Sequence, residues 1–276
     1  MRRTGLFGAQ LCFTLLVCAF MFVPVVLSVM AGFTANYIRG FSSGLTLRWL
    51  FEVWALYKDA IGLSLLIALA CLAVTLVVGV PTAYFLAKAN HWSTRLVEEL
   101  LVTPLAVPGL AIALGLIITY GGIREFRSHW TFILVGHVLY TLPFMVRSVL
   151  AVLSSIDLKT LEEGAASLGA TYWQRFFTIG LPNARSGIVA GALMVVTLSV
   201  GEFNITWMLH TPINKTVPVG LADSYASMRI EIGSAYTTVF LVMIVPLLLL
   251  IQYIAEPVPS RARKNAAAVP QLAGST

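Results

Sequence analysis

Three polar side chains, Glu202, Asn204 and Thr206, lie inside an apolar stretch that covers about residues 184–209. A carboxylate at bilayer depth is costly, so it is expected to face the interior of a helix bundle or water. If the helix is continuous, Glu202 shares a face with Thr206. Three roles are open for Glu202: a hydrogen-bond or ion-pair partner between helices, a residue lining a water-filled path, or a near-interface residue of little consequence.

A further hypothesis is acid–base catalysis, in which Glu202 would act with His137 from another apolar stretch. A lone histidine on such a helix is more often a packed, hydrogen-bonding residue. The sequence offers no nucleophile–base pair and no metal-ligand spacing, and its cysteines lie in apolar stretches, where thiols usually serve packing. We therefore expect no catalytic residue and no metal site.

The composition places these residues in a membrane protein. The chain is 58% hydrophobic and 11% charged, against about 25% charged in a soluble domain. A bilayer core requires about 20 apolar residues per helix, and backbone groups in lipid must be paired internally. We predict an all-α, polytopic fold with about six transmembrane helices, over residues 9–32, 60–87, 100–121, 130–153, 184–209 and 234–255.

The positions of Lys and Arg give the orientation. With the N-terminus inside, most of the 18 basic residues lie on the cytoplasmic side, including the clusters at Arg2–Arg3 and 261–264. Both termini and the connection 157–182 are then cytoplasmic. Topology accounts for the net charge of +6 without nucleic acid, and the basic ends suit contact with membrane lipid.

The connection 157–182 is unusually long and polar for a link between two spans. Leu161, Ala165, Leu168 and Tyr172 fall on one helical face, and Asp157 is placed to cap the helix start. Gly169 then permits a break. The pattern predicts two short helices at an angle, which either lie on the membrane surface or enter a groove on a partner protein.

A spaced motif in this connection resembles the cytoplasmic signature of permease subunits in binding-protein-dependent ABC importers. The signature is Glu-Ala-Ala, three residues, Gly, nine residues, Ile, one residue, Leu-Pro. Six of its seven fixed positions are present, and glycine replaces the first alanine. The positions that correspond to the signature are Glu163, Gly164, Ala165, Gly169, Ile179, Leu181 and Pro182, and Gly164 is the one that departs from it.

The resemblance implies that the connection is a coupling loop seated in a cleft of an ATPase subunit. Glu163 would then contact the ATPase, Gly169 would form the turn between helices, and Ala165 would allow close packing. The return into the membrane would be shaped by Ile179, Leu181 and Pro182. Plain packing remains the alternative for Ala165, Ile179 and Leu181, and Gly164 would loosen the helix because glycine disfavours helix by about 1 kcal/mol.

The resemblance also implies the domains and the partners. Residues 1–58 would form an N-terminal transmembrane helix and outer loop, 59–256 the ABC importer transmembrane domain, and 257–276 a disordered cytoplasmic tail. The chain has no Walker-type phosphate loop, so ATP and Mg would bind a separate ATPase and this chain would hold no cofactor. The other expected partners are a second permease, identical or homologous, and an external solute-binding protein at the bacterial inner membrane.

The stretch around Glu202 is similar to one branch of these permeases. The run Gly201-Glu202-Phe203 and the segment 216–220 resemble permeases for polyamines, phosphonates, sulfate, molybdate and ferric ion. Glu202, Asn204 and Thr206 are the candidate translocation-path residues, and a polyamine-like or phosphonate-like solute is favoured. The alternatives are an ion-coupled carrier or channel, and the intramembrane enzyme.

Overall fold

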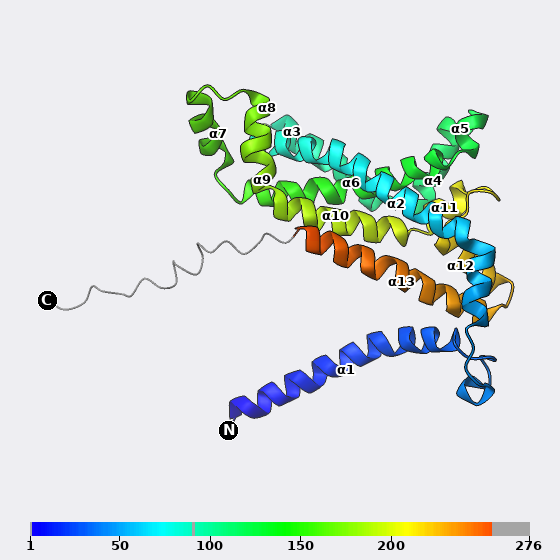
Figure 1. The fold of residues 1–276 in the computed structure, drawn as a ribbon. Coiled ribbons are helices and arrows are strands. Elements are labelled where there is room, and N and C mark those ends of the chain that lie inside the picture. Colours follow the sequence, from blue (N-terminus) through cyan, green and yellow to red (C-terminus); the bar gives the residue numbers. More distant parts are fainter. Residues whose placement is uncertain (1, 90–91, 256–276) are drawn as a thin grey trace.

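The computed structural model describes residues 2–89 and 92–255, which form helices joined by short loops (Figure 1). An isolated β-bridge between Thr34 and Leu45 closes the loop between the first two long helices. The predicted tail at 257–276 lies outside the described residues. The elements are α1 Arg2–Ala31, η1 Gly40–Ser43, α2 Arg48–Lys88, α3 Trp92–Ala106, α4 Gly109–Tyr120, α5 Arg124–Ser128, α6 Trp130–Ser154, α7 Leu158–Ser167, α8 Tyr172–Arg175, the π-helical turn η2 Phe176–Gly180, α9 Leu181–Asn183, α10 Arg185–Val200, α11 Asn204–Leu209, α12 Val217–Ala226 and α13 Ile230–Ala255.

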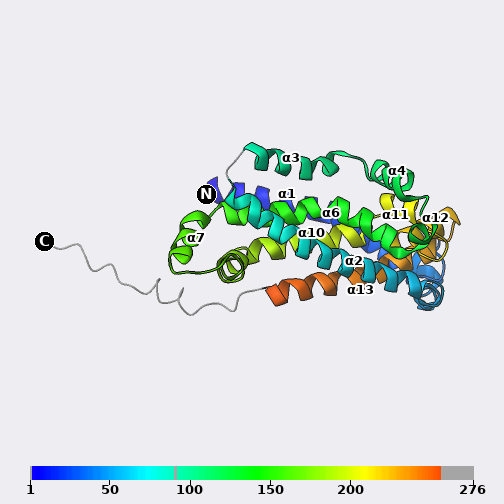
Figure 2. The ribbon, with the colours of Figure 1, turned by 90° about the horizontal axis from the view of Figure 1, so that it is seen from above.

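The centre of the fold is formed by α2, α6 and α10, which lie side by side (Figure 2). Small residues allow their backbones to approach closely. A Cβ atom on Gly187 of α10 would lie 2.5 Å from the Ser148 carbonyl oxygen of α6, and one on Gly191 would lie 2.7 Å from Met145 Sδ. Glycine is therefore required where α10 crosses α6.

Among residues 2–89 and 92–255, four helices are long and apolar enough to cross a membrane. Two bent pairs, α3 with α4 and Tyr172–Asn183 with α10, raise the number to six if each pair is one span. The expectation of about six spans is met in this form. The second span begins earlier than predicted, because α2 runs without a break from Arg48, across the boundary drawn at 58/59.

The third and fifth spans are not the continuous helices that the apolar pattern predicts. α3 and α4 meet at 103°, at Pro108, whose ring removes a backbone N–H donor. The stretch 184–209 is divided by Gly201–Phe203 into α10 and α11. Hydropathy registers apolar character and not backbone direction, so the pattern alone does not show these breaks.

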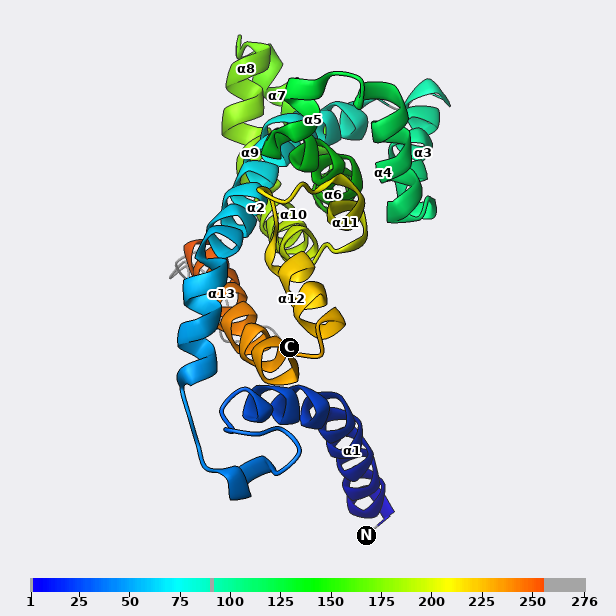
Figure 3. The same ribbon diagram turned by 90° about the vertical axis from the view of Figure 1, so that its right-hand side faces the viewer.

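α1 stands apart from the bundle (Figure 3). Its apolar side chains are exposed, and it meets the rest of the chain at its end, where Gly32 lies against Ser234 and Ala235 of α13. The start of α1 and the end of α13 point toward the same end of the molecule as α7 and α8 (Figure 1). The side of the membrane on which the termini lie stays a prediction.

Candidate functional site

The predicted coupling loop forms two short helices outside the bundle (Figure 1). The Asp157 carboxylate accepts the Thr160 N–H at 3.2 Å and caps α7. Gly169 then adopts φ +84°, a conformation that strains other residues, and turns the chain toward α8. Thr171 and Gln174 cap α8 reciprocally in a capping box. The sequence therefore predicted correctly the helix–turn–helix shape and the cap.

The outer surface of the loop is apolar and uncovered. Leu161, Leu168, Trp173 and Phe177 are all exposed, and Leu168 is 89% exposed. The face predicted from Leu161 and Leu168 therefore points away from this chain's own bundle. Large uncovered apolar patches mark interaction surfaces.

The motif residues divide between the outer surface and the bundle. Glu163 is exposed, and its nearest charge is Lys159 at 3.8 Å, one helical turn earlier. The position of Gly164 is open, because a Cβ atom there would have no neighbouring atom within 4 Å, and Ala165 is half-buried. These three positions are accessible to a partner chain on the outer side of α7.

The C-terminal half of the motif lies where the chain returns from the loop to the bundle. Ile179 and Leu181 pack against the buried cluster of α2, α6 and α10, whereas Pro182 is exposed in α9. Gly180 touches α2 so closely that a Cβ atom would lie 2.5 Å from the Tyr84 ring. The chain then bends by 71° into α10.

A buried carboxylate, Glu162, joins this loop to the bundle. Its side chain is 4% exposed, and its Oε2 atom contacts Lys88 Nζ at the end of α2 and Arg175 Nη1 of α8 at 3.3 Å. Lys88 also lies over the rings of Tyr84 and Tyr172, at 4.9 and 5.0 Å from their centroids. Glu162, Lys88 and Arg175 are called the Glu162 cluster below.

Sequence reasoning missed the Glu162 cluster. Leu158 and Glu162 are one turn apart and both buried, so they form the inward face of α7. The sequence does contain a signal for this inward face, because Leu158 and Glu162 are four residues apart. The more apolar face of Leu161 and Leu168 obscured it. Burial raises the pKa of the Glu162 carboxyl, and the Arg175 guanidinium partly opposes that rise.

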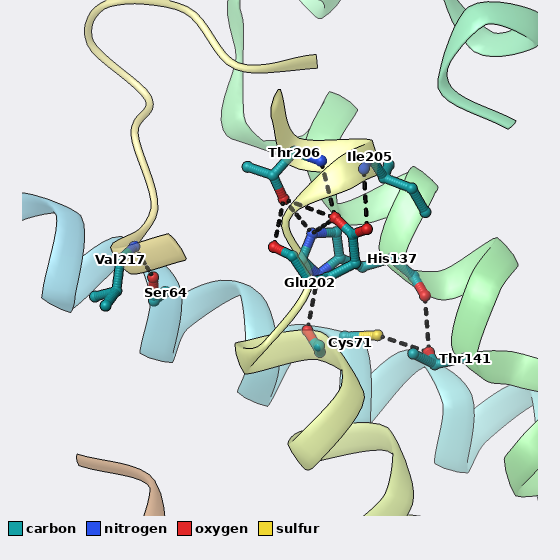
Figure 4. A network of polar contacts seen from close by, with 9 residues as sticks. Ser64, Cys71, His137, Thr141, Glu202, Ile205, Thr206 and Val217 are labelled. Atoms are coloured by element: carbon teal, nitrogen blue, oxygen red, sulfur yellow. Dashed lines mark hydrogen bonds and ion pairs between the residues drawn. The ribbon is translucent and has the colours of Figure 1, made fainter. Parts of the chain in front are cut away.

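The second predicted region surrounds Glu202 and is a buried hydrogen-bond network (Figure 4). Glu202 lies in the break between α10 and α11. Its Oε1 accepts the Ile205 N–H at 2.9 Å and its Oε2 accepts the Thr206 N–H at 2.9 Å. The carboxylate thus caps the start of α11 and satisfies donors that the helix itself leaves unpaired. The expectation of a continuous helix through Glu202 was wrong, and the proximity of Thr206 arises from this cap.

His137 of α6 connects the cap to neighbouring helices. Its Nδ1 lies 2.9 Å from Ser199 Oγ, and its Nε2 lies 2.8 Å from Thr206 Oγ1. Glu202 Oε2 is 3.9 Å from the same Nε2. The network continues from the His137 carbonyl through Thr141 to Cys71 of α2 (Figure 4). These contacts bind four helices together through polar atoms in the interior.

The three candidate path residues do not share one environment. Glu202 and Thr206 are buried in the network, whereas Asn204 is exposed. A hollow of about 410 Å³ lies nearby, and none of the three lines it. Its wall includes Gly201 and Phe203 from the break, Tyr225 of α12 and Phe240 of α13. Among the described residues, no group of three or more His, Cys, Asp or Glu is placed to hold a metal.

Comparison with known proteins places this geometry in a family. Residues 79–264 match the family described as "Binding-protein-dependent transport system inner membrane component". The spermidine/putrescine transport system permease protein PotB of Escherichia coli is 31% identical, covering 73% of this chain and 78% of its own. The molybdenum transport system permease protein ModB of Haemophilus influenzae is 27% identical, covering 67% and 87%.

A third relative and a solved structure cover more of the chain. The putative 2-aminoethylphosphonate transport system permease protein PhnV of Salmonella paratyphi A is 26% identical over 88% of this chain and 92% of its own. A bacterial ABC transporter involved in the import of alginate has a chain that superposes with a TM-score of 0.71 at 17% identity. That match covers 94% of this chain and 98% of the other, and it shows a shared fold.

Proposed function

This chain belongs to the family of binding-protein-dependent transport system inner membrane components, and we propose that it forms half of a translocation pathway driven by a separate ATPase. It is a permease subunit of an ABC importer. The observation that carries the proposed coupling is the exposed apolar surface of α7 and α8, which lies outside the bundle beside the accessible Glu163. A helical surface of this kind suits a groove on a protein partner.

The proposed coupling mechanism requires contacts that differ between nucleotide states. A ligand shifts a conformational equilibrium only by its differential affinity for the two states. We assign Glu163, Gly164 and Ala165 to the ATPase contact, Gly169 to the turn, and Ile179, Leu181 and Pro182 to the return. Movement of α7 and α8 by the ATPase would then tilt α6 and α10, to which they are joined by short connections. ATP and Mg would bind the ATPase alone.

Co-purification and uptake test this function together. The tagged permease is expected to bring an ATPase subunit with it, and uptake is expected to stop when that ATPase is made catalytically inactive. Glu163→Lys reverses the exposed charge, and Gly169→Trp forces a side chain onto a positive-φ backbone. Both variants are expected to insert in the membrane but to lose the ATPase or its coupling.

Two other functions predict different results in that experiment. An ion-coupled carrier or channel would continue uptake with the inactive ATPase and respond to an ion gradient. An intramembrane enzyme would convert its substrate and would need His137 beside Glu202, whose carboxylate is instead occupied by two backbone N–H groups. Normal ATPase binding and normal uptake in both loop variants would contradict the coupling role.

For the solute, we propose a small organic molecule that is polyamine-like or phosphonate-like. PotB and PhnV, which are named for such solutes, are similar to this chain over most of its length. The hollow beside α11 supports the polyamine-like alternative, because its described wall is almost entirely apolar and carries Phe203, Tyr225 and Phe240 but no charged side chain. Aromatic faces attract organic cations, whereas a bare oxyanion requires donors.

The solute proposal is tested on the cognate external binding protein. Thermal shift is measured with spermidine, 2-aminoethylphosphonate, molybdate and sulfate as parallel ligands. Stabilisation by either organic ligand supports the proposal, and stabilisation by molybdate or sulfate alone rejects it. The mass of the intact complex tests whether two identical or two homologous permeases, with their ATPase subunits, complete the assembly.

A further inference from the structure

We propose that the Glu162 cluster is a positioning device that carries movement of the coupling loop into α2, distinct from the ATPase contact assigned to Glu163. The inference rests on the proposed coupling function and adds to it a residue outside the six matched motif positions. Its basis is that one buried carboxylate of α7 holds cations from two other elements, Lys88 of α2 and Arg175 of α8.

The chain connectivity shows why α2 needs such a link. α6 leads into α7 through three residues, and α9 leads into α10, so α6 and α10 are joined covalently to the loop. α2 ends at Lys88 and has no covalent link to the loop there. Among the described residues of α7, Glu162 is the one whose side chain makes polar contacts with another element. The cluster is therefore the polar connection between α7 and the end of α2.

The surroundings of Lys88 hold this connection in one geometry. Its ammonium group lies over Tyr84 of its own helix and Tyr172 of α8. Tyr84 in turn packs edge-on against Phe176 at 5.0 Å and leaves no space for a side chain at Gly180. The end of α2 is thus enclosed by the loop on several sides, and the ion pairs resist sliding of α7 along it.

Burial explains why an ion pair suits this role. A charge removed from water is tolerated only while its partners are in place, so separation of Glu162 from Lys88 and Arg175 is strongly opposed. An exposed ion pair such as Lys159 with Glu163 separates readily, because water can solvate each partner, and it transmits little movement. The two adjacent glutamates therefore have different tasks: Glu163 faces outward and Glu162 holds α7 to the bundle.

The test measures transport of radiolabelled spermidine or 2-aminoethylphosphonate, whichever stabilises the binding protein, per ATP hydrolysed, in proteoliposomes that contain the whole transporter and its binding protein. Glu162→Gln and Lys88→Met are expected to lower this ratio about tenfold, within the usual range of coupling energies, while the ATPase co-purifies at the wild-type level. Glu162→Asp keeps the negative charge and is expected to retain most of the wild-type transport per ATP. Glu99→Gln, a matched change at an exposed glutamate of α3, is expected to leave it unchanged.

A cross-link distinguishes a mechanical link from a merely stabilising one. Lys88→Cys with Glu162→Cys is prepared in a background carrying Cys12→Ser and Cys18→Ser, because those two thiols are exposed. A short bifunctional thiol reagent is expected to restore at least half of the wild-type ratio, and the uncross-linked protein is expected to stay uncoupled. If Glu162→Gln fails to assemble, the cross-linked double-cysteine protein tests the role of the Glu162 cluster in its place.

The outcomes separate the two proposals. A wild-type chain that brings no ATPase contradicts the proposed coupling function itself. A functional wild-type transporter in which Glu162→Gln and Lys88→Met keep the wild-type ratio overturns the role of the Glu162 cluster. So does a cross-linked protein that assembles but remains uncoupled.

Discussion

Two buried carboxylates, Glu202 and Glu162, are stabilised in opposite ways. Glu202 lies in the bundle interior and accepts two backbone N–H groups at 2.9 Å, beside a histidine. Glu162 lies at the end of the bundle and contacts two cationic side chains from separate elements. A backbone cap fixes its own segment, whereas side-chain ion pairs connect elements that are distant in sequence. Burial alone therefore does not assign a function to an acid.

The cap and the cluster therefore differ in what their loss should damage. Removal of the Glu202 cap leaves backbone donors of α11 unpaired inside the protein, so the fold should suffer. Removal of the Glu162 charge frees α7 from α2 while each helix keeps its own backbone hydrogen bonds, so coordination between elements should suffer. Substitutions at the two acids test this difference.

The largest expected effect is that of Glu202→Ala. It leaves two buried N–H groups without acceptors, and the free energy of unfolding should fall by about 3 kcal/mol. The measurement is thermal unfolding of the purified complex, followed by circular dichroism. Asn204→Ala, two residues away at an exposed position, is the control and should change stability by less than about 0.5 kcal/mol. Equal losses in the two variants would contradict the capping role.

The sharpest test of the comparison is the same substitution at both acids. Glu202→Gln keeps an oxygen that accepts one of the two N–H groups, so transport per ATP should stay within about twofold of wild type. Glu162→Gln should lower that ratio about tenfold. Both are measured in the same proteoliposome assay. A larger loss of coupling at Glu202 than at Glu162 would reverse the assignment and return Glu202 to the translocation path.

A smaller, stabilising effect is expected at Gly164, the one motif position that departs from the family pattern. A methyl group there meets open space, and alanine favours helix over glycine by about 1 kcal/mol. Gly164→Ala should therefore slow amide hydrogen exchange in α7. Gly169→Ala is the contrast, because its φ of +84° penalises any side chain, and exchange should accelerate. If Gly164→Ala instead destabilises α7, a neighbour outside this chain must restrict the space at Gly164.

The smallest effect is the pH dependence of the α7 cap. Hydrogen bonding to Thr160 lowers the pKa of the Asp157 carboxyl below its usual value. A group with a lowered folded-state pKa stabilises the fold above its unfolded pKa, and the contribution is lost as the pH falls through the folded value. The protection factor for hydrogen exchange at the start of α7, which is the intrinsic rate at a given pH divided by the observed rate, should therefore fall in acid. Asp157→Asn should remove that acid dependence.

Sequence reasoning succeeded where local rules control the outcome. Asp157 caps α7, Gly169 makes the turn, and the motif spacing identified the family, since each depends on residues near one another in the chain. It failed at Glu202, which was placed inside a continuous helix. Hydropathy counts apolar residues and does not detect a backbone break that a side chain has capped.

The amino-acid sequence is sufficient to identify this chain as a helical permease with a helix–turn–helix loop between its fourth and fifth spans. Composition, caps and a spaced motif are properties of short segments, so they can be read without coordinates. The three-dimensional arrangement was needed to show that Glu162 faces inward to Lys88, 74 residues away, and that Glu202 caps α11 beside His137. Those pairings depend on which helices become neighbours, and packing among distant segments sets that choice.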